Sequence, residues 1–128
     1  MQTDEIENYL ANRHADGAAL FREFRAKALA AGPDVTEKVS RTMVAWKRVR
    51  TFATAYVKGR YLEASIDLPD GVEHPHLRAA FKTSKAVTTH RFTLEKGESV
   101  DERMTAWLKR AYRTVGLGAR AVGEQTPR

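Results

Sequence analysis

The sequence predicts an α+β fold, in which an antiparallel sheet of about five strands packs against helices on one face. Three observations support this prediction. Helical periodicity occurs only towards the two ends of the chain, the stretch between them changes to a period of two, and turn residues separate the alternating runs. Because helices and strands are grouped rather than alternating, an antiparallel sheet is favoured over a parallel one.

The N-terminal region predicts two helices. Thr3 is a suitable N-cap residue, and the two acidic residues after it suit the positive end of a helix dipole. Residues 16–17 interrupt this pattern, and a second helix then extends through Ala31 before Gly32-Pro33 stops it. The apolar residues of the second helix recur at helical spacing and should form its buried face: Leu20, Phe21, Phe24 and Ala28.

The middle of the chain predicts four strands. Residues 35–39 alternate as a half-buried edge strand, and three further strands follow at residues 43–49, 51–58 and 61–68. Gly59 supplies the tight hairpin between the last two. The fourth strand gives the clearest signal, because its apolar residues share one face: Leu62, Ala64, Ile66 and Leu68.

The last third of the chain predicts a fifth strand and a final helix. A short helical turn is expected at residues 77–81, followed by a strand of mixed pattern at residues 86–95. Ser99 and Glu102 have the spacing of a capping box that opens the helix. The helix then carries an apolar stripe of Met104, Trp107, Leu108, Ala111 and Val115. We expect one domain over residues 1–116 and a flexible tail over residues 117–128.

The composition excludes several classes of protein. A hydrophobic fraction of 42% and a charged fraction of 30% are typical of a soluble globular domain. The chain has no cysteine, which excludes disulfides, thiolate metal sites and thiol nucleophiles. No apolar run approaches the roughly 20 residues of a membrane span, and the acidic N-terminus does not resemble a signal peptide. We therefore expect a cytoplasmic protein without membrane contact.

The positive charge is unevenly distributed. The formal net charge is +6, but residues 38–62 contain seven basic residues and residues 74–94 contain four, with no acidic residue in either window. The rest of the chain is net acidic. The predicted sheet and its connections therefore carry the positive charge, whereas the helices are acidic or mixed, and the folded domain should have a polarised electric field.

Residues 39–57, VSRTMVAWKRVRTFATAYV, together with Gly32-Pro33 and the closing stretch LKRAYRTVG, resemble an uncharacterised prokaryotic family, domain of unknown function 5655. The resemblance covers about residues 17 to 115 and is weakest over residues 74–84. Its anchoring residues here are Ser40, Arg41, Thr42, Phe52, Leu68-Pro69 and Ala111-Tyr112. The resemblance implies a small α+β domain that is also found appended to other modules, and it implies no established activity.

The main candidate site is the basic stretch of the predicted sheet. Its anion-binding candidates are Arg41, Lys47, Arg48, Arg50, Lys58 and Arg60, with Trp46 and Tyr56 between them as ligand-binding aromatic residues. Strand alternation divides these charges between two faces, so the turn regions at residues 48–50 and 58–60 are the better anion contacts. The alternative is a solvated sheet face whose charges prevent edge-to-edge aggregation.

Other constellations predict no catalytic, cofactor or metal site. His74 and His76 are acceptable metal ligands, but nothing else in the sequence completes such a site. Glu63, Asp67 and Lys85 lack the spacing that metal-dependent nucleases use. No nucleophile elbow and no glycine-rich phosphate loop is present.

We therefore expect a binding or adaptor domain rather than an enzyme, whose partner is nucleic acid or an acidic protein. The alternative function is a small-ligand or metal-handling domain with a pocket between sheet and helices. A homodimer through the exposed sheet face is compatible with either function.

Overall fold

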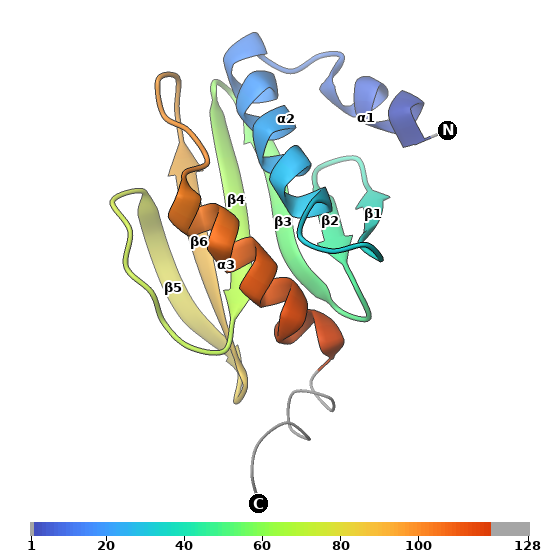
Figure 1. Ribbon diagram of the computed structural model, residues 1–128. Coiled ribbons are helices and arrows are strands. Elements are labelled where there is room, and N and C mark those ends of the chain that lie inside the picture. Colours follow the sequence, from blue (N-terminus) through green and yellow to red (C-terminus); the bar gives the residue numbers. More distant parts are fainter. Residues whose placement is uncertain (1, 119–128) are drawn as a thin grey trace, which may run out of the picture.

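The computed structural model describes residues 2–118 and confirms the α+β fold (Figure 1). Two helices, α1 (Gln2–Leu10) and α2 (Ala15–Leu29), precede the sheet. The predicted buried face of α2 is confirmed. The predicted cap at Thr3 is wrong, since α1 already begins at Gln2 and Thr3 lies inside the helix. At α2 the His14 side chain caps the helix instead by accepting a hydrogen bond from the Asp16 amide, 3.1 Å away.

The sheet has six antiparallel strands rather than five. They are β1 (Thr36–Val39), β2 (Val44–Lys47), β3 (Thr51–Lys58), β4 (Tyr61–Leu68), β5 (Leu77–Ser84) and β6 (Val87–Leu94). Their order across the sheet is β1-β2-β3-β4-β6-β5. The chain passes from β4 to the far edge of the sheet, forms β5, and returns through a hairpin to place β6 beside β4.

The helical turn predicted at residues 77–81 is wrong, because these residues begin β5. The strand gave no alternating signal in the sequence since it has no buried face: only Leu77 is partly buried, and residues 78–84 are all exposed. Two register shifts in the β5–β6 ladder disturb the pattern further. An edge strand of this kind lacks the period of two by which strands are recognised.

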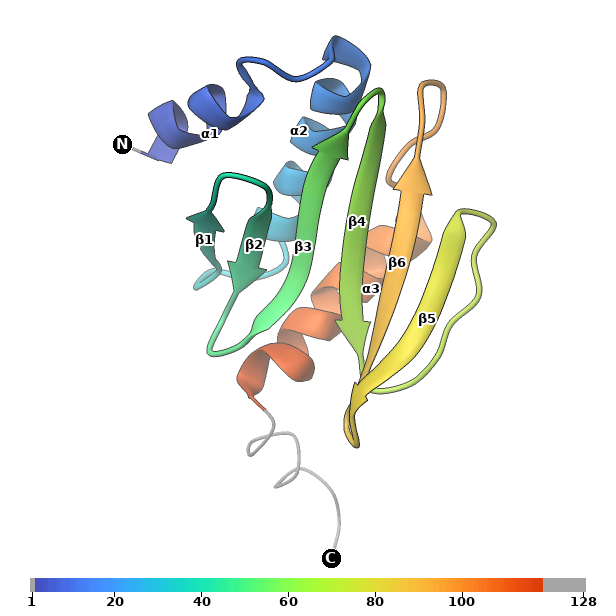
Figure 2. The ribbon, with the colours of Figure 1, turned by 180° about the vertical axis from the view of Figure 1, so that it is seen from behind.

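One face of the sheet is covered and the other is open. Helices α2 and α3 (Glu102–Arg113) lie over β3 and β4 in Figure 1, whereas Figure 2 shows the opposite face without any helix. Trp46 lies at the centre of the covered side, with ring centroids 5.9 Å from Phe21 and 5.5 Å from Phe24. The space between α2, α3 and the sheet is thus filled by core side chains.

The end of the chain departs from the prediction at the helix cap. Asp101 is the N-cap of α3 and accepts a hydrogen bond from the Met104 amide at 2.9 Å, so the capping box predicted at Ser99 is wrong. Asp101 stands directly before the first helical residue and supplies the acceptor itself. A 3₁₀ turn, η1 (Val115–Leu117), follows α3. Of the tail predicted at residues 117–128, the part from residue 119 onwards lies outside the described residues.

A buried carboxylate joins α2 to the edge of the sheet. The Glu37 side chain on β1 is 3% exposed and accepts two hydrogen bonds from Arg25 of α2, at 2.7 and 3.0 Å. The Trp46 indole N–H donates to the same carboxylate at 2.8 Å. Three elements therefore meet at one side chain.

No helix within residues 2–118 has the length and apolar character to cross a membrane.

We expect Glu37→Gln to lower the free energy of unfolding by about 2–3 kcal/mol, because it leaves the partly buried Arg25 without its counter-charge. The loss is measured by urea denaturation. Glu7→Gln is the matched control, since Glu7 makes the same paired contact with Arg22 at 2.8 and 2.9 Å on an exposed surface. The control should lose much less stability. Equal losses would show that the Glu37 contact has no special structural role.

Candidate functional site

The predicted anion-binding residues lie at opposite ends of the sheet. Arg48 and Arg50 flank the turn between β2 and β3, while Lys58 and Arg60 flank the hairpin between β3 and β4. Figure 2 shows these two turns at the two ends of β3. The eight residues of β3 separate them by roughly 25 Å at the usual rise of a strand. A single small anion therefore cannot contact both turn regions.

At the end of the sheet where Arg48 lies, the basic side chain and the turn make contacts within the chain itself. The Arg48 guanidinium lies over the Tyr112 ring, 4.4 Å from its centroid, and its Nε is 3.3 Å from an Asp34 carboxylate oxygen. The amides of Val49 and Arg50 both donate to the Gly116 carbonyl, at 2.8 and 3.1 Å. These contacts attach the β2–β3 turn to the last turn of α3 and to η1, so the Arg48 side chain already has partners within the chain.

The two predicted ligand-binding aromatic residues have different environments. Trp46 has no exposed surface and belongs to the core, so its ring is not accessible for stacking on a ligand. The sequence did not reveal that Trp46 is buried. Its neighbours Lys47 and Arg48 are charged whether the Trp46 ring lies on the covered face or on the open face of the strand. Tyr56 is half-buried and lines a hollow at the other end of β3.

That hollow brings together basic residues from three segments. It has a volume of about 420 Å³ and is lined by Arg13, Arg41, Thr42, Tyr56, Val57 and Lys58; we call it the basic hollow. Arg13 follows α1, Arg41 lies in the turn between β1 and β2, and Lys58 ends β3. Three of the predicted site residues, Arg41, Tyr56 and Lys58, thus meet here.

Arg13 is the residue of the basic hollow that the sequence did not suggest. Its Nε donates to the Tyr9 carbonyl at 3.1 Å, and its Nη2 donates to the Arg41 carbonyl at 3.0 Å. The guanidinium also lies over the Tyr9 ring, 4.5 Å from the centroid. Among the side chains of residues 5–118 and the backbone of residues 2–118, the remaining nitrogen, Nη1, has no hydrogen-bond partner. Arg13 is therefore held in one orientation with donor capacity left over.

Tyr9 connects this arginine to the sheet. Its hydroxyl donates to the Thr42 carbonyl at 3.3 Å and accepts a hydrogen bond from the Val57 amide at 3.2 Å. Its ring packs 5.4 Å from Phe21 in the core. One buried side chain thereby fixes α1 against both the β1–β2 turn and β3, which are the segments that carry Arg41 and Lys58.

The basic hollow has no paired carboxylate among the side chains of residues 5–118, which are the side chains that the structure describes. Among the described residues, none of the ion pairs within 4.0 Å involves Arg13, Arg41 or Lys58. Glu5 lines a neighbouring hollow that shares Arg13 and Arg41, but it is not paired with either residue. The three cations therefore have no ion-pair partner among these side chains, and the charge of the basic hollow is positive.

The open face of the sheet is polar, and its carboxylates are already hydrogen-bonded. Thr93 donates to Glu63 at 2.9 and 3.0 Å, and Thr89 donates to Asp67 at 2.8 Å. Burial raises the pKa of Asp67, although the Thr89 hydroxyl and the charge of Arg50 oppose the shift. These are contacts between neighbouring strands, and they account for both carboxylates as parts of the sheet.

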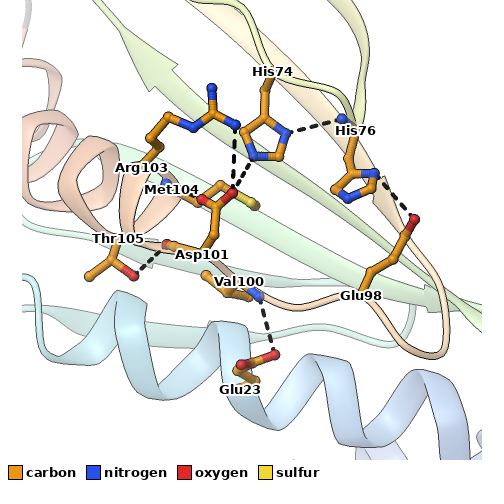
Figure 3. A network of polar contacts seen from close by, with 9 residues as sticks. All are labelled: Glu23, His74, His76, Glu98, Val100, Asp101, Arg103, Met104 and Thr105. Carbon is orange, nitrogen blue, oxygen red and sulfur yellow. Dashed lines mark hydrogen bonds and ion pairs between the residues drawn. The ribbon is translucent and has the colours of Figure 1, made fainter.

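The two histidines of the β4–β5 connection anchor it to α3 (Figure 3). The His74 side chain is 1% exposed; its Nε2 lies 2.7 Å from an Asp101 carboxylate oxygen, and its Nδ1 accepts a hydrogen bond from the His76 amide at 3.0 Å. The ring also packs edge-on against Phe92 and Trp107, with centroids 5.6 and 5.8 Å away. Both ring nitrogens of His74 are thus engaged by the chain.

His76 completes this anchor. Its Nδ1 lies 3.3 Å from a Glu98 carboxylate oxygen, and Glu98 in turn accepts a hydrogen bond from the Glu95 amide at 2.8 Å. No group of three or more histidine, aspartate or glutamate side chains in residues 2–118 is placed to hold a metal ion. The contacts of His74 and His76 therefore hold the β4–β5 connection against the segment that precedes α3.

A family model covers almost the whole described domain. The model for domain of unknown function DUF5655 matches residues 6–115, which include all six strands, α2, α3 and most of α1. The chain belongs to this family. The resemblance seen in the sequence is therefore confirmed, and it extends further towards the N-terminus than residue 17. No curated protein and no solved structure matches the chain.

The DUF5655 match includes all the residues that build the basic hollow. It also includes the anchor between His74 and Asp101. The family name supplies no activity, so the arrangement of side chains has to support any functional conclusion.

We expect the anchor of this DUF5655 domain to weaken in acid. Burial alone would raise the pKa of Asp101, but hydrogen bonds from the Met104 amide and His74, with the charges of His74 and Arg103, lower it from its ordinary value of 3.8. Because the folded-state pKa is the lower one, the stabilisation is present above pH 3.8 and is lost as the pH falls through the folded-state value.

This expectation is tested with Asp101→Asn, which can still accept from the Met104 amide but does not titrate. Urea denaturation between about pH 5 and pH 2.5 should show wild type more stable at the upper end and the difference closing in acid. Glu102→Gln, which changes an exposed neighbour, is the control. A difference between wild type and Asp101→Asn that stayed constant with pH would contradict the expectation.

Proposed function

We propose that this domain is a binding module for an anionic partner, that the partner is nucleic acid, and that the basic hollow contacts its phosphate backbone. One observation carries the proposal. Arg13, Arg41 and Lys58 come from three separate segments of the chain and line one hollow together with Tyr56. Uncompensated cations beside an accessible aromatic ring are the combination that single-stranded nucleic acids bind.

The orientation of Arg13 supports this proposal. An arginine fixed by two backbone carbonyls and an aromatic ring loses little side-chain entropy when a phosphate binds. Its free nitrogen can donate a charge-assisted hydrogen bond to a phosphate oxygen. Arg41 and Lys58 are exposed and supply further positive charge beside it.

The size and field of the site are also compatible with a nucleotide. A hollow of about 420 Å³ lies within the usual range for ligand sites, roughly 300–1,000 Å³. The surrounding window of residues 38–62 contains no acidic residue, so the local potential favours the approach of polyanions.

The absence of cysteine fits a reducing compartment, and we propose a cytoplasmic location on that ground.

The proposal predicts salt-dependent binding that depends on the basic hollow. We expect a fluorescein-labelled thymidine oligonucleotide of about twelve nucleotides to bind in an anisotropy titration, and the affinity to fall steeply between about 50 and 200 mM salt. Arg41→Gln and Lys58→Gln should each weaken binding about threefold to tenfold, and each should reduce the slope against log salt by about one, because each removes a phosphate contact.

Two variants with the same loss of charge serve as controls. The first is Lys109→Gln, at a residue on α3. The second is Lys47→Gln, at a residue at the opposite end of the sheet from the basic hollow. Both should leave affinity and salt slope close to wild type. Equal losses in all four variants would show general charge attraction without a site. Absence of binding at low salt would refute nucleic acid as the partner.

A further inference from the structure

β5 is the most exposed strand of the sheet. All seven residues 78–84 are exposed, whereas half of the residues of the central strands β3 and β4 are buried. The helices lie over the middle of the sheet, and β5 extends beyond them as the outermost strand on the side opposite β1 (Figure 1). No helix of residues 2–118 therefore covers this strand, and its residues 78–84 remain exposed.

The outer backbone groups of β5 also lack a protein partner. Within residues 2–118, β5 forms ladder bonds only with β6, and no backbone hydrogen bond joins residues 78–84 to another segment. The connection of residues 69–76 runs beside β5 in both ribbon views. The Val72 amide donates to His90 at 3.1 Å, and the His76 carbonyl accepts from the Thr93 amide at 3.1 Å, so the connection is attached to β6.

The charge of this strand has one sign. Arg78, Lys82 and Lys85 lie on β5 and its turn, and residues 74–94 contain no acidic residue. None of the ion pairs among the described residues involves these three cations. Phe81 lies among them with 45% of its surface exposed, and it pairs with Thr89 on the open face.

These features disfavour the pairing of β5 with a second copy of this chain and permit its pairing with an acidic strand. Basic residues and register shifts on an edge strand normally prevent aggregation between identical copies. A second copy of this chain would place Arg78 and Lys82 against the same charges, and like charges across a strand pair are destabilising. A strand carrying carboxylates would instead meet opposite charges, and it could satisfy the unpaired backbone groups, which a nucleic acid could not.

We propose that β5 docks an extended acidic segment of a partner protein, which adds to the sheet as a seventh strand. Carboxylates of the segment lie opposite Arg78 and Lys82, and an apolar side chain contacts Phe81. Backbone hydrogen bonds provide affinity, and the charges select the sequence. This interface is separate from the basic hollow and does not depend on the proposed nucleic-acid binding.

The test uses labelled peptides of about nine residues that alternate glutamate with valine, threonine or tyrosine. We expect binding in an anisotropy titration, and slower amide hydrogen exchange at residues 77–84 when the peptide is present. A peptide of the same sequence with alternate amides methylated on one edge should bind about tenfold more weakly, since it cannot form the ladder. This control leaves the protein unchanged.

Charge reversal supplies the second arm. The variant with both Arg78→Glu and Lys82→Glu should bind the glutamate peptides about tenfold more weakly and gain affinity for their lysine counterparts. The variant with both Arg41→Gln and Lys58→Gln should bind the glutamate peptides as wild type does. No binding of any acidic peptide, binding that survives methylation or charge reversal, or protection of β5 by self-association or by the thymidine oligonucleotide would each overturn the proposal.

Discussion

The buried carboxylate of Glu37 is the contact on which the arrangement of this domain depends. A charged side chain that is 3% exposed is stable only when strong donors surround it, and Arg25 and Trp46 are those donors. Because Arg25 belongs to α2 and Trp46 to β2, the three groups can be satisfied only when the helix lies against the β1–β2 hairpin in one register. The core rings that surround Trp46 then complete this side of the fold.

The position of that hairpin decides what the far end of the sheet can bind. The β1–β2 turn carries Arg41, and the Thr42 carbonyl beside it accepts a hydrogen bond from the Tyr9 hydroxyl. Tyr9 in turn supports Arg13 through its ring and its own carbonyl. The buried contacts of Glu37 and Tyr9 therefore set the distance between Arg13 and Arg41, two cations that are far apart in the sequence. Towards the opposite edge of the sheet, the His74–Asp101 anchor holds the β4–β5 connection against α3 and leaves β5 exposed.

The sequence predicted the fold class and placed β3 and β4 correctly. β4 alternates strictly because one of its faces is buried, and β3 lies between the turn of residues 48–50 and the hairpin glycine Gly59. The prediction failed at β5, where both faces are exposed and no periodicity exists. The site was predicted only in part. Arg41, Lys58 and Tyr56 were recognised as basic and aromatic residues of the sheet, but their convergence depends on α1, and Arg13 has no local signal because its neighbours are set by tertiary contacts.

The central claim is that the three cations of the basic hollow act as one anion-binding site. A nuclear magnetic resonance titration with hexathymidylate tests it most directly, because the amide and side-chain resonances report the contact residue by residue. The account predicts concentrated shifts at Arg13, Arg41, Thr42, Tyr56 and Lys58, which weaken together as salt is added. Shifts concentrated at residues 48–50, or spread evenly over all exposed basic residues, would contradict it.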